Sequence, residues 1–180
     1  NSFEVTTGSV AFNPPFGPTV ANLGLDPATL ATYNSLPVAS DTDSIPNDKD
    51  DFIKAAIDQT ITPLGYDPIG LNNNLPVANT AIDANLLQGD YLATHTFGWT
   101  EFDIDPLTQQ LLVTTYGVDS YSEEELLADP NATINQTPRI VSQFSVNPQQ
   151  PQLNFDIVGN SIVLNSSNNF NLVRYQLIQT

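Results

Sequence analysis

FGWTEFDIDPLTQQLLVTTY, residues 97–116, is the stretch that decides the fold of this chain. It predicts two strands, 97–104 and 110–116, on either side of Asp105-Pro106-Leu107-Thr108. Asp and Pro are turn formers, because Asp hydrogen-bonds its own backbone and Pro presets its φ angle. We therefore expect an antiparallel hairpin here, with the rest of the fold arranged around it.

Strand patterns recur on both sides of this hairpin. Residues 3–12 are rich in Val, Phe and Thr and predict a strand that stops at Asn13-Pro14-Pro15. Residues 139–146 predict another strand, and alternating apolar residues with a Gly159-Asn160 turn predict a meander at the C-terminal end. The strands of this meander are expected at 153–157, 162–164 and 170–178.

Three short helices interrupt the strands. Asp26 followed by Pro27 predicts a helix over 27–34, and Asn47 or Asp48 caps a second helix that runs to about Thr60. Ser122 and Glu125 form a capping box for a third helix, which ends near Asp129-Pro130. Residues 62–81 are expected to form an irregular loop.

These elements predict an α+β fold in which antiparallel sheet dominates, sandwich-like and with a few short helices. We expect two parts, residues 1–146 and a β-meander tail of residues 147–180, which docks on the same domain or on a partner.

The charge of the chain excludes some partners. Twenty acidic residues face four basic ones, which gives a net charge of −16. Such a surface repels nucleic acids and anionic membranes. No apolar run is long enough to span a bilayer, so we expect no membrane insertion.

Acidity with few lysines, together with the absence of Cys and Met, favours an exported protein at the cell surface or outside the cell. The alternative is that this composition arose by chance and says nothing about where the protein is located. Because the chain begins at Asn1 rather than Met, we expect a processed or excised product.

Residues 89–146 resemble the C-terminal portion of secreted PhoD-like alkaline phosphatases of the cyanobacterial type. His95-Thr96-Phe97-Gly98-Trp99, followed by Glu101–Asp105, is similar to the strand with His, Gly and an aromatic residue that leads into a hairpin in that family. The opening residues 3–10 resemble the strand that follows the family's last metal-ligand motif. The resemblance covers most of residues 1–146 and leaves out the last 34 residues.

The resemblance implies metal-assisted hydrolysis of phosphate esters, yet the family's D-x-H, G-N-H and G-H-x-H ligand motifs are missing from this chain. One His and no Cys cannot supply a typical transition-metal cage. We therefore predict no catalytic residues and no activity of the chain alone. The catalytic motifs would lie on a missing N-terminal portion or on a partner chain.

His95 is the only imidazole and the first candidate for chemistry. A lone His is more often structural, and in a phosphatase pocket it would orient an outer-shell group rather than bind the metal. Phe97 and Trp99 are candidates for an aromatic sugar platform, although core packing is the commoner role of such residues in a strand.

Calcium is the cofactor that the acidic residues favour, because Ca²⁺ takes six to eight oxygen ligands. The spacing departs from an EF-hand at Ile45 and Pro46, so only a non-standard site remains, and the alternative is a solvated loop that caps the next helix. The candidate ligands are Asp41, Asp43, Asp48 and Asp50.

Two other functions stay open beside the phosphatase segment. The chain could be a structural subunit of an extracellular polymer, filament or surface layer, in which identical subunits exchange β-strands. The third hypothesis is a Ca²⁺-dependent adhesion domain.

Overall fold

A computed structural model describes residues 3–7, 25–38, 42–71, 82–148, 153–158 and 161–166, the last two ranges by their backbone. The chain divides into two compact units, residues 1–148 and residues 149–180, called unit 1 and unit 2 below. The described residues form an α+β fold in which antiparallel sheet dominates, as predicted.

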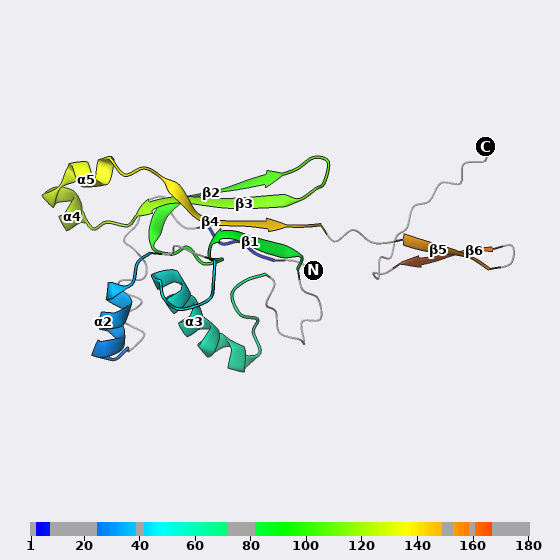
Figure 1. The fold of residues 1–180 in the computed structure, drawn as a ribbon, viewed down its shortest axis with the longest axis horizontal. Coiled ribbons are helices and arrows are strands. Elements are labelled where there is room, and N and C mark those ends of the chain that lie inside the picture. Colours follow the sequence, from blue (N-terminus) through cyan, green and yellow to red (C-terminus); the bar gives the residue numbers. More distant parts are fainter. Residues whose placement is uncertain are drawn as a thin grey trace. The chain divides into compact units, whose positions relative to one another are not determined.

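Unit 1 contains a four-stranded antiparallel sheet with the strand order β1-β4-β3-β2 (Figure 1). The predicted hairpin is confirmed, with Thr96 paired to Asp119 at its open end and Ile104 to Leu111 beside the turn. Asp105 closes the turn by accepting backbone N–H bonds from Leu107 and Thr108, which is the role expected of Asp at this position. The four strands are β1 (Ala84–Gly89), β2 (Thr96–Ile104), β3 (Leu111–Asp119) and β4 (Arg139–Val146).

A pair of glycines allows β2 and β3 to approach closely near the open end of the hairpin. Gly98 lies opposite Gly117, and a Cβ atom at Gly98 would stand 1.7 Å from the carbonyl oxygen of Tyr116. Only glycine leaves room for this contact.

The helices of unit 1 begin where the capping residues predict. Asp26 accepts two backbone N–H bonds at the start of α2, Asp48 caps α3, and Ser122 and Glu125 form the complete capping box of α4. Figure 1 shows α2 and α3 on one side of the sheet and α4 and α5 at one end of it. The helices are α2 (Pro27–Ser35), α3 (Lys49–Ile61), the 3-10 helix η1 (Thr62–Leu64), α4 (Glu123–Ala128) and α5 (Pro130–Ile134).

Four features differ from the sequence predictions, and two predicted strands lie partly or wholly outside the described residues. Residues 3–7 form no strand, although the side chain of Val5 packs against the core, and residues 8–12 lie outside the described residues. Strand β1, η1 within the expected loop 62–81, and α5, which begins where the third helix was expected to end, were not predicted. The predicted strand 170–178 also lies outside the described residues.

The core of unit 1 lies on one face of the sheet, which we call the inner face. Ala84, Val113, Phe144 and Val146 form its buried centre, and side chains that include Val5 and Tyr91 pack over them. A second, smaller cluster joins Tyr33 of α2 to Ile53 of α3. Among the described residues no helix is long and apolar enough to cross a membrane.

Unit 2 contains a two-stranded antiparallel sheet. Its strands are β5 (Leu153–Val158) and β6 (Ser161–Ser166), paired from Leu153–Ser166 to Val158–Ser161. This hairpin confirms the first two strands of the predicted meander.

Candidate functional site

His95 is the last residue of the segment 90–95, just before β2, and is buried against α2 and α3. Its Nδ1 lies 2.5 Å from Oδ1 of Asp50, and its Nε2 lies 2.6 Å from the hydroxyl of Tyr33. Both ring nitrogens therefore contact protein groups. We call Tyr33, Asp50, Thr94 and His95 the His95 network.

The helix cap explains how Asp50 reaches His95. Asp48 begins α3 by accepting the backbone N–H of Asp51, which places Asp50 in the first turn with its side chain buried. Oδ1 of Asp50 also accepts hydrogen bonds from the backbone N–H of Thr94, at 3.1 Å, and from its hydroxyl, at 2.9 Å. A local capping signal thus delivers a carboxylate to a residue 45 positions along the chain.

The order Asp50–His95–Tyr33 is that of a hydrogen-bonded relay in which a carboxylate orients an imidazole toward a hydroxyl. The Tyr33 hydroxyl is a poor nucleophile here, because burial, and then the charge of Asp50, raise its pKa above the usual value. The Tyr33 ring is also buried, packs 5.5 Å from the Phe52 ring and lies under the ammonium of Lys49. The arrangement therefore serves to hold two helices and the start of β2 together.

A second buried pair lies beside this network. Asp51 of α3 and Asp90 of the segment 90–95 are both buried, and their carboxyl groups are hydrogen-bonded to each other. Burial chiefly, then the hydrogen bond and charge of Asp90 and the charge of Asp48, raise the pKa of Asp51 to about 8, against the lowering effect of Lys54. Burial also raises the pKa of Asp90.

Two carboxyl groups in contact must share a proton, since two buried like charges repel each other. Because the pKa values of both carboxyl groups are raised, the pair holds a shared proton at neutral pH. Oδ2 of Asp90 is buried and has no hydrogen-bond partner among the described residues. The pair therefore joins α3 to the segment 90–95 through a titratable contact.

The four predicted calcium ligands do not gather in the part of the chain that the structure describes. Asp41 lies outside the described residues, and Asp43 is exposed, with Oδ1 accepting the backbone N–H of Ile45. Asp48 and Asp50 are buried in the cap and the His95 network. The described residues contain no group of three or more His, Cys, Asp or Glu arranged to hold a metal ion, so calcium stays a prediction.

The two aromatic candidates of β2 have separate environments. Phe97 is buried with its ring edge-on to Tyr121, as a core residue would be. Trp99 is 43% exposed, stacks on Tyr116 at 5.1 Å between ring centroids, and donates its indole N–H to Glu101. The structure therefore does not combine Phe97 and Trp99 into one platform.

Sequence reasoning singled out His95 and Asp50 but did not connect them, and it missed Tyr33, Thr94 and the Asp51–Asp90 pair. Asp90 contacts Asp51, 39 residues away, rather than its near neighbour His95. No local pattern signals contacts over such separations. The only available signal was that several carboxylates occur near the start of a helix with an apolar face.

Comparison with family models, with curated proteins and with solved structures finds no match to this chain.

Proposed function

We propose that this chain is the non-catalytic C-terminal segment of an exported, metal-dependent alkaline phosphatase. The reaction would be hydrolysis of phosphate esters, with the metals and the nucleophile held by motifs on sequence not present here. The resemblance of residues 89–146 motivates the proposal. The observation that carries it is an uncovered part of the sheet's inner face.

The inner face continues from β4 and β3 onto β2. The pairings place Phe102 opposite Val113 and Ile104 opposite Leu111, so both side chains share the face that forms the core. Val113 is buried, whereas Phe102 is 52% exposed and Ile104 is 60% exposed. Leu107, at the hairpin turn, is 91% exposed.

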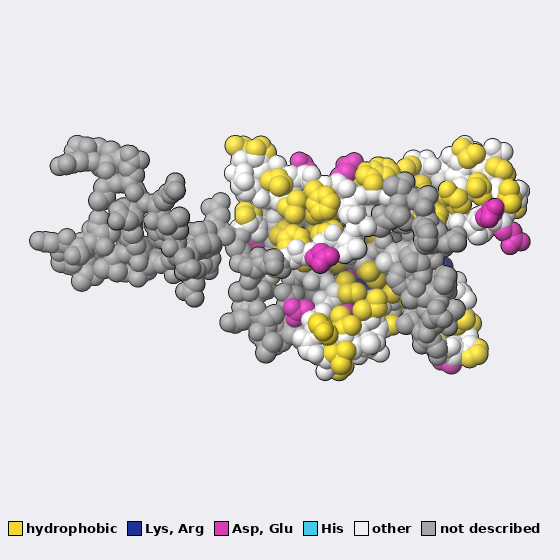
Figure 2. Space-filling view, turned by 180° about the vertical axis from the view of Figure 1, so that it is seen from behind, with side chains coloured by type: hydrophobic (Ala, Val, Ile, Leu, Met, Phe, Trp, Pro, Cys, Tyr) yellow, Lys and Arg dark blue, Asp and Glu magenta, His cyan; other side chains and the backbone are white. Residues whose placement is uncertain are grey.

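A long strand that exposes apolar side chains and has no neighbour on one side favours association with another polypeptide. Within the described sheet β2 is an edge strand, paired only with β3. Figure 2 shows hydrophobic side chains gathered in patches on one face of unit 1, with single acidic side chains between them. A catalytic portion that packs on β2 would extend the core across these residues.

The His95 network supports the non-catalytic part of the proposal. Both ring nitrogens of His95 contact Asp50 and Tyr33, so the imidazole is committed to internal contacts. On this proposal His95 holds the start of β2 in place, and β2 in turn carries the surface that meets the catalytic portion.

Antibodies against residues 1–148 test the proposal in material from the natural source. The captured species is expected to hydrolyse a chromogenic phosphomonoester, and its mass spectrum is expected to contain sequence with the missing metal-ligand motifs. The isolated chain is expected to be inactive with Ca²⁺. Captured material that consists of 19.5 kDa units alone, without activity, would overturn the proposal.

Variants of β2 make the test specific. Phe102→Asp together with Ile104→Asp is expected to abolish association with the catalytic portion, because two charges would enter the apolar contact. Leu127→Asp is the control, since Leu127 is also apolar and, at 73%, even more exposed, but lies on α4. Equal association of both variants would contradict the role assigned to β2.

A structural subunit of an extracellular polymer is the second candidate, and the two-stranded sheet of unit 2 favours it. An isolated two-stranded hairpin is marginally stable and gains stability by pairing with further strands. Strand exchange between subunits would supply them. Negative-stain microscopy with Ca²⁺ distinguishes the candidates, because filaments are expected only for the polymer and a monodisperse monomer at high concentration argues against it.

A further inference from the structure

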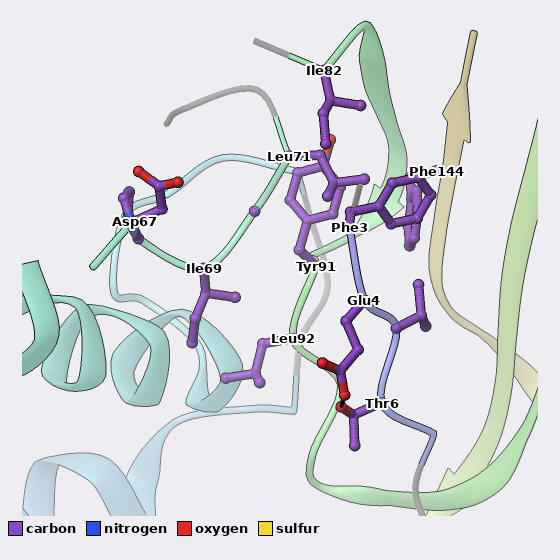
Figure 3. A pocket seen from close by; sticks show the side chains of 13 residues that line it. Phe3, Glu4, Thr6, Asp67, Ile69, Leu71, Ile82, Tyr91, Leu92 and Phe144 are labelled. Atoms are coloured by element: carbon purple, nitrogen blue, oxygen red, sulfur yellow. Dashed lines mark hydrogen bonds between the residues drawn. The ribbon is translucent and has the colours of Figure 1, made fainter. Parts of the chain in front are cut away.

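A cavity of about 450 Å³ lies in unit 1, lined by residues that the His95 network does not use (Figure 3). Its volume falls within the range of small-molecule sites. The walls come from residues 3–6, residues 67–71, Ile82 with residues 91–92, and β4. The side chains that determine its chemistry are Phe3, Glu4, Asp67, Ile69, Tyr91 and Phe144.

Specific contacts hold two of these walls in place. The backbone N–H of Ile69 donates to Oδ1 of Asp58 on α3, at 2.8 Å, and Asp58 also pairs with Lys54 at 3.6 Å. On the opposite wall the rings of Tyr91 and Phe144 pack with centroids 5.2 Å apart at an interplanar angle of 56°. Residues 67–71 are therefore anchored to α3, and Tyr91 is anchored to the core of the sheet.

The charges around the cavity are of one sign. Glu4 and Asp67 contribute carboxylates, and no Lys or Arg occurs among the lining residues. Figure 3 shows Glu4 and Asp67 on different sides of the pocket, with Ile69 and Leu92 on the surface between them. Together with the net charge of −16, this arrangement disfavours anionic ligands such as phosphates and carboxylates.

Aromatic rings add a second attraction for cations. The faces of aromatic rings carry partial negative charge, so an ammonium group close to Phe3, Tyr91 or Phe144 would be stabilised. The apolar part of the same ligand would contact the aliphatic side chains that line the cavity. The geometry points to a small organic ammonium ion with an apolar body as the ligand of this cavity. This inference does not depend on the proposed phosphatase function.

Three phenyl compounds of similar size and different charge test it at low salt and pH 7. They are 2-phenylethylammonium, 2-phenylethanol and phenylacetate, each titrated into the full chain while methyl and amide NMR signals are followed. Saturable shifts are expected at Ile69, Leu71, Ile82 and Leu92. The ammonium is expected to bind roughly three- to tenfold more tightly than the alcohol, and the carboxylate most weakly.

Two variants separate charge from shape. Glu4→Gln with Asp67→Asn is expected to remove most of the difference in affinity between the ammonium and the alcohol, because only the attraction of the aromatic rings remains, and to leave the affinity for the alcohol unchanged. Ile69→Phe is expected to fill the cavity and block all three probes, with folding checked by circular dichroism.

The inference is overturned if no probe gives a saturable shift, if the shifts lie outside the cavity, or if the alcohol and the ammonium bind equally to the unaltered chain.

Discussion

The His95 network buries polar side chains, whereas the β2–β3 hairpin exposes apolar side chains to solvent. Between α2, α3 and the segment 90–95, an imidazole and several carboxyl groups are buried, whereas on β2 Phe102 and Ile104 are exposed. The buried polar groups are stable because they hydrogen-bond one another. The exposed apolar groups have no such partner among the described residues, which is why we assign their surface to association.

This contrast implies that the two regions respond differently to substitution. Changes in the buried network should alter the stability of the chain itself. Changes on β2 should alter association and leave the isolated chain almost as stable as before.

The largest effect is expected for His95→Ala. The substitution leaves the Asp50 carboxylate and the Tyr33 hydroxyl buried without their central partner, at a cost of about 3–5 kcal/mol in the free energy of unfolding. Urea unfolding followed by circular dichroism measures this change. Asp43→Asn is the control, because Asp43 is an exposed carboxylate from the same acidic stretch; equal losses for both variants would refute the structural role of His95.

A smaller effect is expected when Asp51 loses its proton. The pKa of Asp51 rises from 3.8 to about 8 on folding, so between these pH values the folded chain holds a proton that the unfolded chain releases. The contribution of Asp51 to the free energy of unfolding is therefore fully present below about pH 4 and is lost as the pH rises to about 8. The slope of unfolding free energy from this group is at most about 1.4 kcal/mol per pH unit.

Urea unfolding at pH 5, 6, 7 and 8 measures the slope. Asp51→Asn is the matched variant, since its amide still donates to Asp90 but does not titrate. We expect a shallower slope in the variant, and identical slopes would show that Asp51 and Asp90 do not share a proton.

The smallest effect on stability is expected on β2. Phe102→Ser with Ile104→Ser should change the unfolding free energy of the isolated chain by no more than about 0.5 kcal/mol per site, because both side chains are already largely exposed. Thermal unfolding measures it, and Val113→Ser on the adjacent strand is the buried comparison. A loss on β2 as large as that at Val113 would mean that the chain itself covers these residues.

Local signals explain which elements could be predicted. The caps at Asp26, Asp48 and Ser122 act within one helical turn, and the hairpin turn at Asp105 acts within four residues. Strand β1 carries no such signal. It forms because Ala84 and Leu86 pair with Val146 and Phe144, some 60 residues further along the chain.

Residues 3–7 show the reverse case. Their composition favours a strand, yet Val5 packs on the core and no ladder forms there. Local composition thus favours a strand but does not supply the neighbouring strand with which it would pair.

The sequence by itself determined the helix starts, the central hairpin, the strong negative charge and the choice of His95 as the residue to examine, because these depend on composition or on neighbours within a turn. Only the tertiary structure decided that His95 joins Asp50 and Tyr33, that Asp51 and Asp90 share a proton, and that Phe102 and Ile104 lie exposed on the core face. These contacts join residues 7 to 62 positions apart in the chain, and the energy of such contacts depends on burial that no local pattern specifies.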